Sequence, residues 1–162
     1  MLAVGAILAL SACGTESMEP VSTPAPTVEM TATPAQFASI IAEHKASWQD
    51  YADSMVDCAL ARVLGDSAMD SIKVTTCSLT ASTVTLEARS TLKAIDALPA
   101  PDAEVAALVE RTVNVLTPLS QIEASEACAE PASETCGDME ATVNAAIRPL
   151  VPVLAAWSPY LN

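Results

Sequence analysis

Residues 33–65 read TPAQFASIIAEHKASWQDYADSMVDCALARVLG, and this stretch decides the fold class. Thr33 is a favourable N-cap, and Pro34 suits the first helical position, where a missing N–H costs nothing. Residues then recur at alternating spacings of four and three: Phe37, Ile41, His44, Trp48, Tyr51, Met55 and Cys58. This spacing places them on one face and predicts a long amphipathic helix that ends at Gly65. Four more residues are expected to widen that face: Ile40, Val56, Ala59 and Val63.

A second helix is expected from about Ser67 or Asp70 to Leu98. Its core-facing residues again alternate by three and four: Val74, Cys77, Ala81, Val84, Ala88, Thr91, Ile95 and Leu98. The Thr and Ser residues between Thr75 and Thr85 also suit a β-strand. The length of the segment and its lack of Gly and Pro favour a helix.

Two more helices follow the break at residues 98–102. The third is expected to place these residues on its buried face: Val105, Leu108, Thr112, Val115, Leu119 and Ile122. Pro118 lies inside it and should kink it, because proline cannot bond to the carbonyl of Asn114. The fourth is expected to begin at Pro131 and to be bent or broken at Pro149 and Pro152. With short loops, residues 34–162 are predicted to be all-α, an up-down-up-down four-helix bundle.

Four cysteines in this region imply two disulfides, for which three connectivities exist. Cys58 and Cys77 lie almost symmetrically about a turn near residues 67–68, and Cys128 and Cys136 about residue 132. We therefore favour the local pairs Cys58–Cys77 and Cys128–Cys136, each stapling one hairpin. Crossed pairings remain open, because both turns fall at the same pole of the bundle.

The chain begins with a short apolar segment, residues 1–12, that ends in Leu10-Ser11-Ala12-Cys13. This ending resembles the lipobox of bacterial envelope lipoproteins. The resemblance implies that residues 1–12 are a signal peptide and that Cys13 carries a lipid anchor whose acyl chains include palmitate. The segment is shorter than the roughly 20 residues that span a bilayer, and it fits a signal-peptide core. No Lys or Arg precedes it, so we expect the natural start to lie upstream of Met1, or the chain to be a fragment.

Residues 13–33 are predicted to be a disordered tether. They are rich in Thr, Ser, Pro and Glu, a composition that buries too little apolar surface to offset the entropy of ordering. Extended, such a segment holds a domain up to ~60 Å from its anchor. The predicted location is the extracytoplasmic face of the cell membrane.

Charge limits the classes of partner. The net charge is −13, which argues against nucleic acid, because that binding depends on Lys and Arg. In the predicted topology, the start of the first helix and the C-terminus share one pole, and the disulfides lie at the other. The disulfide pole is expected to be acidic through Asp57, Asp66, Asp70, Glu123, Glu126, Glu130, Glu134, Asp138 and Glu140.

Catalytic and metal motifs are weak. His44 is the only histidine, so a haem or metal pocket would rest on His44 with a ligand such as Met55, and a Ser–His–Asp triad would also need His44. There is no Cys-x-x-Cys pair and no Gly-x-Ser-x-Gly turn. We predict no catalytic site, no metal and no cofactor.

The preferred hypothesis for function is a lipid-anchored interaction module. Its exposed helical faces or its acidic pole would meet another envelope or extracellular protein. The alternative is a carrier or sensor of a small apolar ligand between the third and fourth helices, near Pro118, Leu119, Pro149 and Leu150. There the prolines could open a cavity in a core that is rich in alanine.

Overall fold

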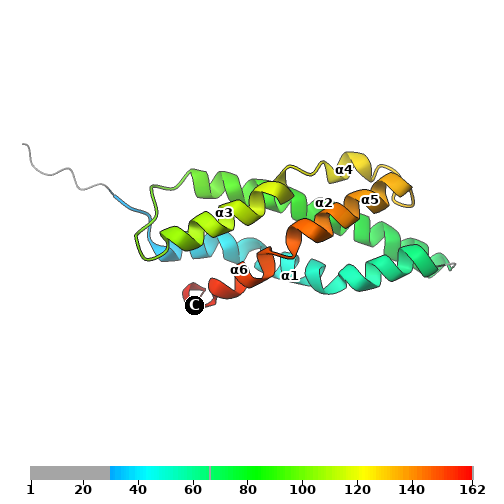
Figure 1. The fold of residues 1–162 in the computed structure, drawn as a ribbon, viewed down its shortest axis with the longest axis horizontal. Coiled ribbons are helices and arrows are strands. Elements are labelled where there is room, and N and C mark those ends of the chain that lie inside the picture. Colours follow the sequence, from blue (N-terminus) through cyan, green and yellow to red (C-terminus); the bar gives the residue numbers. More distant parts are fainter. Residues whose placement is uncertain (1–29, 66, 162) are drawn as a thin grey trace, which may run out of the picture.

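The computed structural model describes residues 30–65 and 67–161. Its elements are α1 (Pro34–Leu64), α2 (Ala68–Asp96), α3 (Ala106–Ser120), α4 (Ala124–Ala127), α5 (Glu134–Ile147), α6 (Leu150–Ala156) and the 3₁₀ helix η1 (Ser158–Tyr160). Figure 1 shows α5 and α6 following one another in a single column. Together with α1, α2 and α3 this column completes an up-down-up-down four-helix bundle, so the predicted fold is confirmed.

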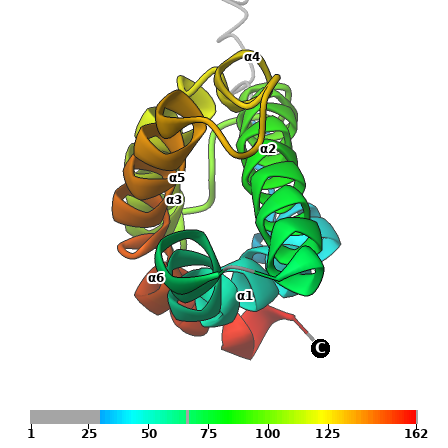
Figure 2. The ribbon, with the colours of Figure 1, turned by 90° about the vertical axis from the view of Figure 1, so that its right-hand side faces the viewer.

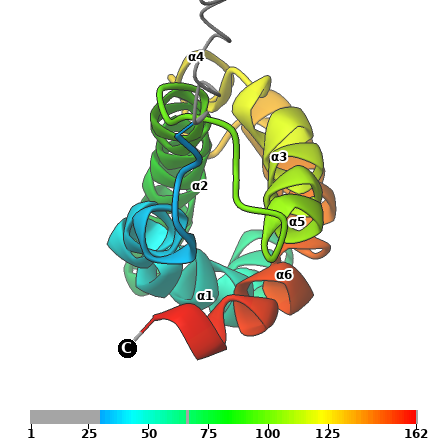
Figure 3. The same cartoon turned by 90° about the vertical axis from the view of Figure 1, so that its left-hand side faces the viewer.

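The bundle has two distinct ends (Figure 1). The start of α1, the loop of residues 97–105 and the C-terminal segment lie at the entry end, and the α1–α2 turn and α4 lie toward the opposite, turn end. The end-on views in Figures 2 and 3 show the columns arranged around a common core. The start of α1 and the C-terminal segment therefore share one end, as the predicted topology requires.

Local signals set where the two long helices begin. The backbone N–H of Thr33 donates to Oε1 of Gln36 at 2.8 Å, and Pro34 occupies the first turn of α1. At α2, Ser67 Oγ accepts from the N–H of Asp70 at 3.2 Å, and the Ser67 N–H donates to the Asp70 carboxylate at 3.2 Å. Such reciprocal bonds satisfy N–H groups that have no partner within the helix.

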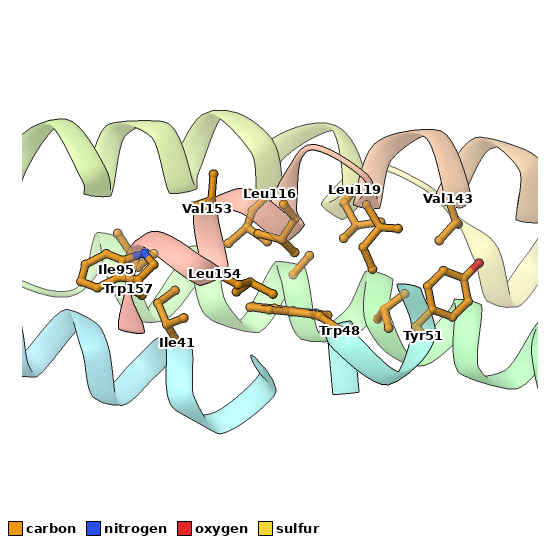
Figure 4. Packing of buried hydrophobic residues seen from close by; sticks show 14 of the residues in the cluster. Ile41, Trp48, Tyr51, Ile95, Leu116, Leu119, Val143, Val153, Leu154 and Trp157 are labelled. Atoms are coloured by element: carbon orange, nitrogen blue, oxygen red, sulfur yellow. The ribbon is translucent and has the colours of Figure 1, made fainter. Parts of the chain in front are cut away.

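The core is built from the faces that the spacing predicted. Trp48 and Trp157 are fully buried, and Figure 4 shows them among apolar side chains from all four columns. The Trp157 indole N–H donates to Thr112 Oγ1 at 2.9 Å, which satisfies its only donor. Val56 and Val63, expected to widen the buried face of α1, are 69% and 78% exposed. That part of the prediction is wrong, and it is wrong for the exposed Ala59 as well, because no other helix of the described chain packs against the outer side of α1.

The predicted start of the fourth column is also wrong. The fourth column begins at Glu134 rather than at Pro131, because Ser133 Oγ accepts from the N–H of Cys136 at 3.2 Å and caps α5. The one-turn helix α4 was not expected. The break expected at Pro149 is confirmed, because α5 ends at Ile147 and α6 begins at Leu150. The interruption expected at Pro152 is wrong, because Pro152 lies in the first turn of α6, where its missing N–H costs no helical hydrogen bond.

The described chain is ordered slightly before α1. Ala32 is buried, its N–H donates to the carbonyl of Ala100 at 2.8 Å, and its carbonyl accepts from Asp102 at 3.0 Å. The end of the predicted tether is thus fixed against the α2–α3 loop. The predicted signal peptide, Cys13 and most of the tether lie outside the described residues.

Candidate interaction surface

Both predicted disulfides are present. Cys58 on α1 is bonded to Cys77 on α2, with Cα atoms 5.8 Å apart. Cys128, just after α4, is bonded to Cys136 on α5, with Cα atoms 4.5 Å apart. The two bonds fix the hairpins near the turn end, and neither crosses from one hairpin to the other.

An ion pair ties the two stapled hairpins together. Arg62 on α1 places Nη2 2.8 Å and Nε 3.1 Å from the two carboxylate oxygens of Glu140 on α5, and Nη1 donates to the Ser133 carbonyl at 3.3 Å. Glu140 was expected on a solvated acidic surface, but its side chain is only 9% exposed. That expectation is wrong, because a guanidinium from α1 pairs with both of its oxygens.

The same region contains three close groups of metal-ligand type, Cys128, Cys136 and Glu140. The two sulfur atoms are bonded to each other, so they offer no thiolate, which is the form that binds metals. Both oxygens of Glu140 are already engaged by Arg62. The cluster is therefore structural.

The acidic pole is only partly an acidic surface. Glu123, Glu126 and Glu130 line a shallow hollow of about 630 Å³ beside α4. Glu123 accepts from Arg89 Nη2 at 2.9 Å, which neutralises one of the three. Asp66 lies outside the described residues.

The most distinctive surface is the outer side of α2. Its large apolar residues Met69, Ile72, Leu79 and Leu86 are 72%, 62%, 63% and 52% exposed. Together with the exposed Thr76 and Thr83 they recur at spacings of three and four, which aligns them along the helix. We call this set the outer stripe: Met69, Ile72, Thr76, Leu79, Thr83 and Leu86.

The threonines make the outer stripe more apolar than its composition indicates. The hydroxyl of Thr76 donates to the carbonyl of Ile72 at 3.0 Å, and that of Thr83 to the carbonyl of Leu79 at 3.0 Å. Each hydroxyl proton is thus bonded inside the helix, so neither threonine needs water to accept a hydrogen bond from its hydroxyl. The stripe presents methyl and methylene groups over its whole length.

The outer stripe is also free of charge. Residues 74–86 contain no charged side chain, although the whole chain carries −13. The nearest charges along α2 are Asp70, Lys73, Glu87 and Arg89, two of each sign, and across the α1–α2 groove Asp50 and Asp57 line a hollow with Thr76. The core side of the same helix is separate, since Val74, Ala81 and Ala88 are buried against the bundle.

The spacing that defines the outer stripe is visible in the sequence, but it was not predicted. The competing face from Val74 to Ile95 has the same period. A second apolar group lies on the outer side of α1: Val56, Leu60, Val63 and Leu64.

His44 lies in a polar cluster between α1 and α2. Ser90 Oγ is 3.3 Å from Nε2 of His44, and Glu87 Oε1 is 3.7 Å from Nδ1. In the described chain, buried polar atoms without a partner are Trp48 Nε1, Glu87 Oε2 and Thr91 Oγ1, each in this cluster or one helical turn from it.

The order Ser90–His44–Glu87 is that of a catalytic triad, but its setting differs. Ser90 lies within α2, where backbone N–H groups bond to carbonyls of the preceding turn and leave no donors for an oxyanion. The Ser90 hydroxyl itself donates to the Glu87 carbonyl at 3.0 Å. Both ring nitrogens of His44 face α2 side chains, so the cluster links the two helices.

The residues proposed around an apolar ligand are divided between core and surface. Leu119 and Leu150 are fully buried and pack in the core, whereas Pro118 and Pro149 are exposed. Pro118 lies in the last turn of α3, which ends at Ser120.

None of the helices in the described part of the chain combines the length and apolar character that a bilayer crossing needs. No protein-family model matches the chain, and no curated protein or solved structure is significantly similar to it. The fold and the disulfides thus define a disulfide-bonded four-helix bundle, and arguments on function rest on its own surfaces.

Proposed function

We propose that the protein is a lipid-anchored, extracytoplasmic interaction module that binds a protein partner through the outer stripe. One observation carries this proposal: the stripe exposes four large apolar side chains although the bundle already has a closed core. Contiguous exposed apolar surface bordered by polar residues is typical of interaction sites.

Two further features support the proposal. Disulfides are typical of exported proteins, and both of those in this chain lie toward the end opposite to the point where the chain enters the bundle. If Cys13 is lipidated, the anchor joins the bundle at its entry end, and the outer stripe begins near the other end, at Met69. The stripe would then run along the side of the bundle from its far end and be open to partners.

In-cell photo-crosslinking tests the proposed surface. A benzophenone side chain replaces Ile72 in the full chain, and the matched control replaces Asp53, an exposed acidic residue of α1. We expect an adduct of protein mass from position 72 and none from position 53. Equal labelling from both positions, or none from position 72, would contradict the proposal.

The anchor is tested separately by Cys13→Ala. We expect the variant to leave the membrane fraction while its far-ultraviolet circular dichroism is unchanged. Retention of Cys13→Ala molecules from which the leader has been removed would contradict lipid anchoring and leave the surface proposal intact.

The apolar-ligand hypothesis remains a prediction. Native mass spectrometry of protein purified without detergent would show a mass excess if a ligand were held. A mass that matches the oxidised chain alone would contradict it.

A further inference from the structure

We propose that the partner of the outer stripe is the outer stripe of a second copy, so that two α2 helices pack antiparallel about a two-fold axis. This inference rests on the proposed function, because it requires the stripe to be an interaction surface, and it adds the identity of the occupant. Four observations on the stripe and on the chain that precedes it carry the inference.

The first observation is the spacing, which reads the same in both directions. With the two-fold axis between residues 77 and 78, Met69 faces Leu86, Ile72 faces Thr83, and Thr76 faces Leu79 of the second copy. The two central layers each pair a large side chain with a threonine, as interdigitated helices require. A two-fold interface needs such self-complementarity, because the same patch contributes both sides.

The second observation is charge. Two copies that each carry −13 repel one another wherever acidic surfaces meet. The outer stripe reduces this repulsion, since residues 74–86 are uncharged and the flanking Asp70, Lys73, Glu87 and Arg89 of α2 sum to zero. Asp50 and Asp57 of α1 lie beside Thr76, and Asp57 is 3.7 Å from the Lys73 ammonium. Two copies of this acidic protein can therefore approach each other through the outer stripe with less charge repulsion than through the rest of their surface.

The third observation is the size of the surface. From Met69 to Leu86 the stripe is about 26 Å long, and one helix face over that length contacts on the order of 400 Å². A standard stable interface uses about 800 Å² per partner. The stripe is therefore large enough for a weak pair, whose formation depends on a high local concentration of the protein.

The fourth observation is the reach of the preceding chain. Cys13 and Ala32 are 19 residues apart, which corresponds to about 60–65 Å of extended chain. In an antiparallel pair, the entry ends of the two copies lie at opposite ends of the pair. If the pair lies along the membrane, each entry end is close enough to the membrane for the chain from Cys13 to Ala32 to span the distance. Anchoring in one membrane would confine two copies to a common layer and raise their local concentration, which favours a weak pair.

The experiment uses the full chain in cells, with two different epitope tags on two copies. A benzophenone side chain replaces Thr76, which the register places opposite Leu79 of the second copy. We expect adducts that carry both tags, with the crosslink mapping to residues 76–83 of the other copy. Adding Ile72→Gln and Leu79→Gln to this chain should lower the adduct yield by more than about tenfold. The control, Val56→Gln with Val63→Gln on α1, should leave the yield unchanged.

Each alternative outcome is informative. Adducts with another protein alone would overturn the self-pairing and keep the proposed function. Adducts with lipid alone, or none, would overturn both. Adducts between copies that map outside residues 69–86 would overturn this interface and its register.

Salt gives an independent signature of self-pairing. Raising the salt from about 0.01 M to about 0.15 M shortens the Debye length from about 30 Å to about 8 Å. The adduct between two acidic copies should then increase several-fold, because their repulsion is screened. A decrease with salt would overturn the proposal, since it indicates an oppositely charged partner.

Discussion

Replacing Arg62 with methionine should destabilise the bundle strongly. The change removes hydrogen bonds to both oxygens of Glu140 and to the Ser133 carbonyl, and it leaves a carboxylate that is only 9% exposed without a partner. Removing one member of a buried ion pair typically costs about 3–5 kcal/mol. Because Arg62 retains 20% exposure, water reaches the site, and we expect a loss of about 3 kcal/mol.

The double variant Arg62→Met with Glu140→Met should recover most of that loss. It removes both charges and fills the space with apolar atoms, so no unpaired carboxylate remains. Its stability should lie within about 1 kcal/mol of the natural protein. In a double-mutant cycle, the coupling energy should then exceed about 2 kcal/mol, at the upper part of the range for contacting residues.

Urea unfolding followed by circular dichroism measures these differences, provided that the slopes with urea agree among the variants. An Arg62→Met loss below about 1 kcal/mol, or additive losses in the cycle, would refute the role of the ion pair.

Tyr51 gives a second readout. Burial, and then the charge of Glu140, raise the pKa of the Tyr51 hydroxyl above its ordinary value. Glu140→Met should therefore lower that pKa, as measured by tyrosinate absorbance.

Three further predictions concern single side chains. Because the pKa of Tyr51 is raised in the folded protein, its contribution to stability is fully present below pH 10 and is lost as the pH rises further. Tyr51→Phe should therefore make the urea midpoint fall less steeply at alkaline pH. Hydrogen bonds from Ser67 lower the pKa of Asp70, which stabilises the fold above the ordinary carboxylate pKa near 4 and is lost as the pH falls; Asp70→Asn should reduce the acid dependence of the thermal midpoint. Leu116→Ala, in the core, should cost about 2–5 kcal/mol in urea unfolding, and Leu79→Ala, on the outer stripe, less than about 0.5 kcal/mol.

The long helices and the disulfides could be predicted because their signals are local. Thr33 and Pro34 begin α1, and the alternation of three and four residues gives the face that packs inward. The disulfide pairing followed from the symmetry of the cysteines about two turns, without knowledge of distant contacts. A bundle with short loops was the simplest arrangement for such faces.

The errors arose where a distant residue decides the outcome. Glu140 was assigned to solvent because its partner, Arg62, is 78 residues away and cannot be inferred from spacing. Val56 and Val63 continue the apolar pattern of α1, but among residues 30–65 and 67–161 no neighbouring helix covers that side of it. Ser133 and Pro131 both suit a helix start, and the hydrogen bond from Cys136 selects Ser133.

The outer stripe is a second apolar pattern on α2 that the prediction did not separate from the core-facing pattern. α2 carries two apolar patterns with one period, and the prediction placed the Val74–Ile95 pattern in the core but did not recognise the second pattern. The structure buries the pattern that contains Ala81 and Ala88 and leaves Ile72 and Leu79 outside. The larger side chains are thus on the exposed pattern, which is the reverse of what core packing alone would favour.

This reversal indicates that the outer stripe is not needed to hold the bundle together. The first half of α2 has other sources of stability: the reciprocal Ser67–Asp70 bonds at its start and the Cys58–Cys77 disulfide, which contributes about 3 kcal/mol in the loop-entropy estimate. With the helix fixed by these means, its exposed Ile72 and Leu79 have no structural task that burial would explain. Side chains of that size on the outside of an already stable helix are best explained by a partner that covers them.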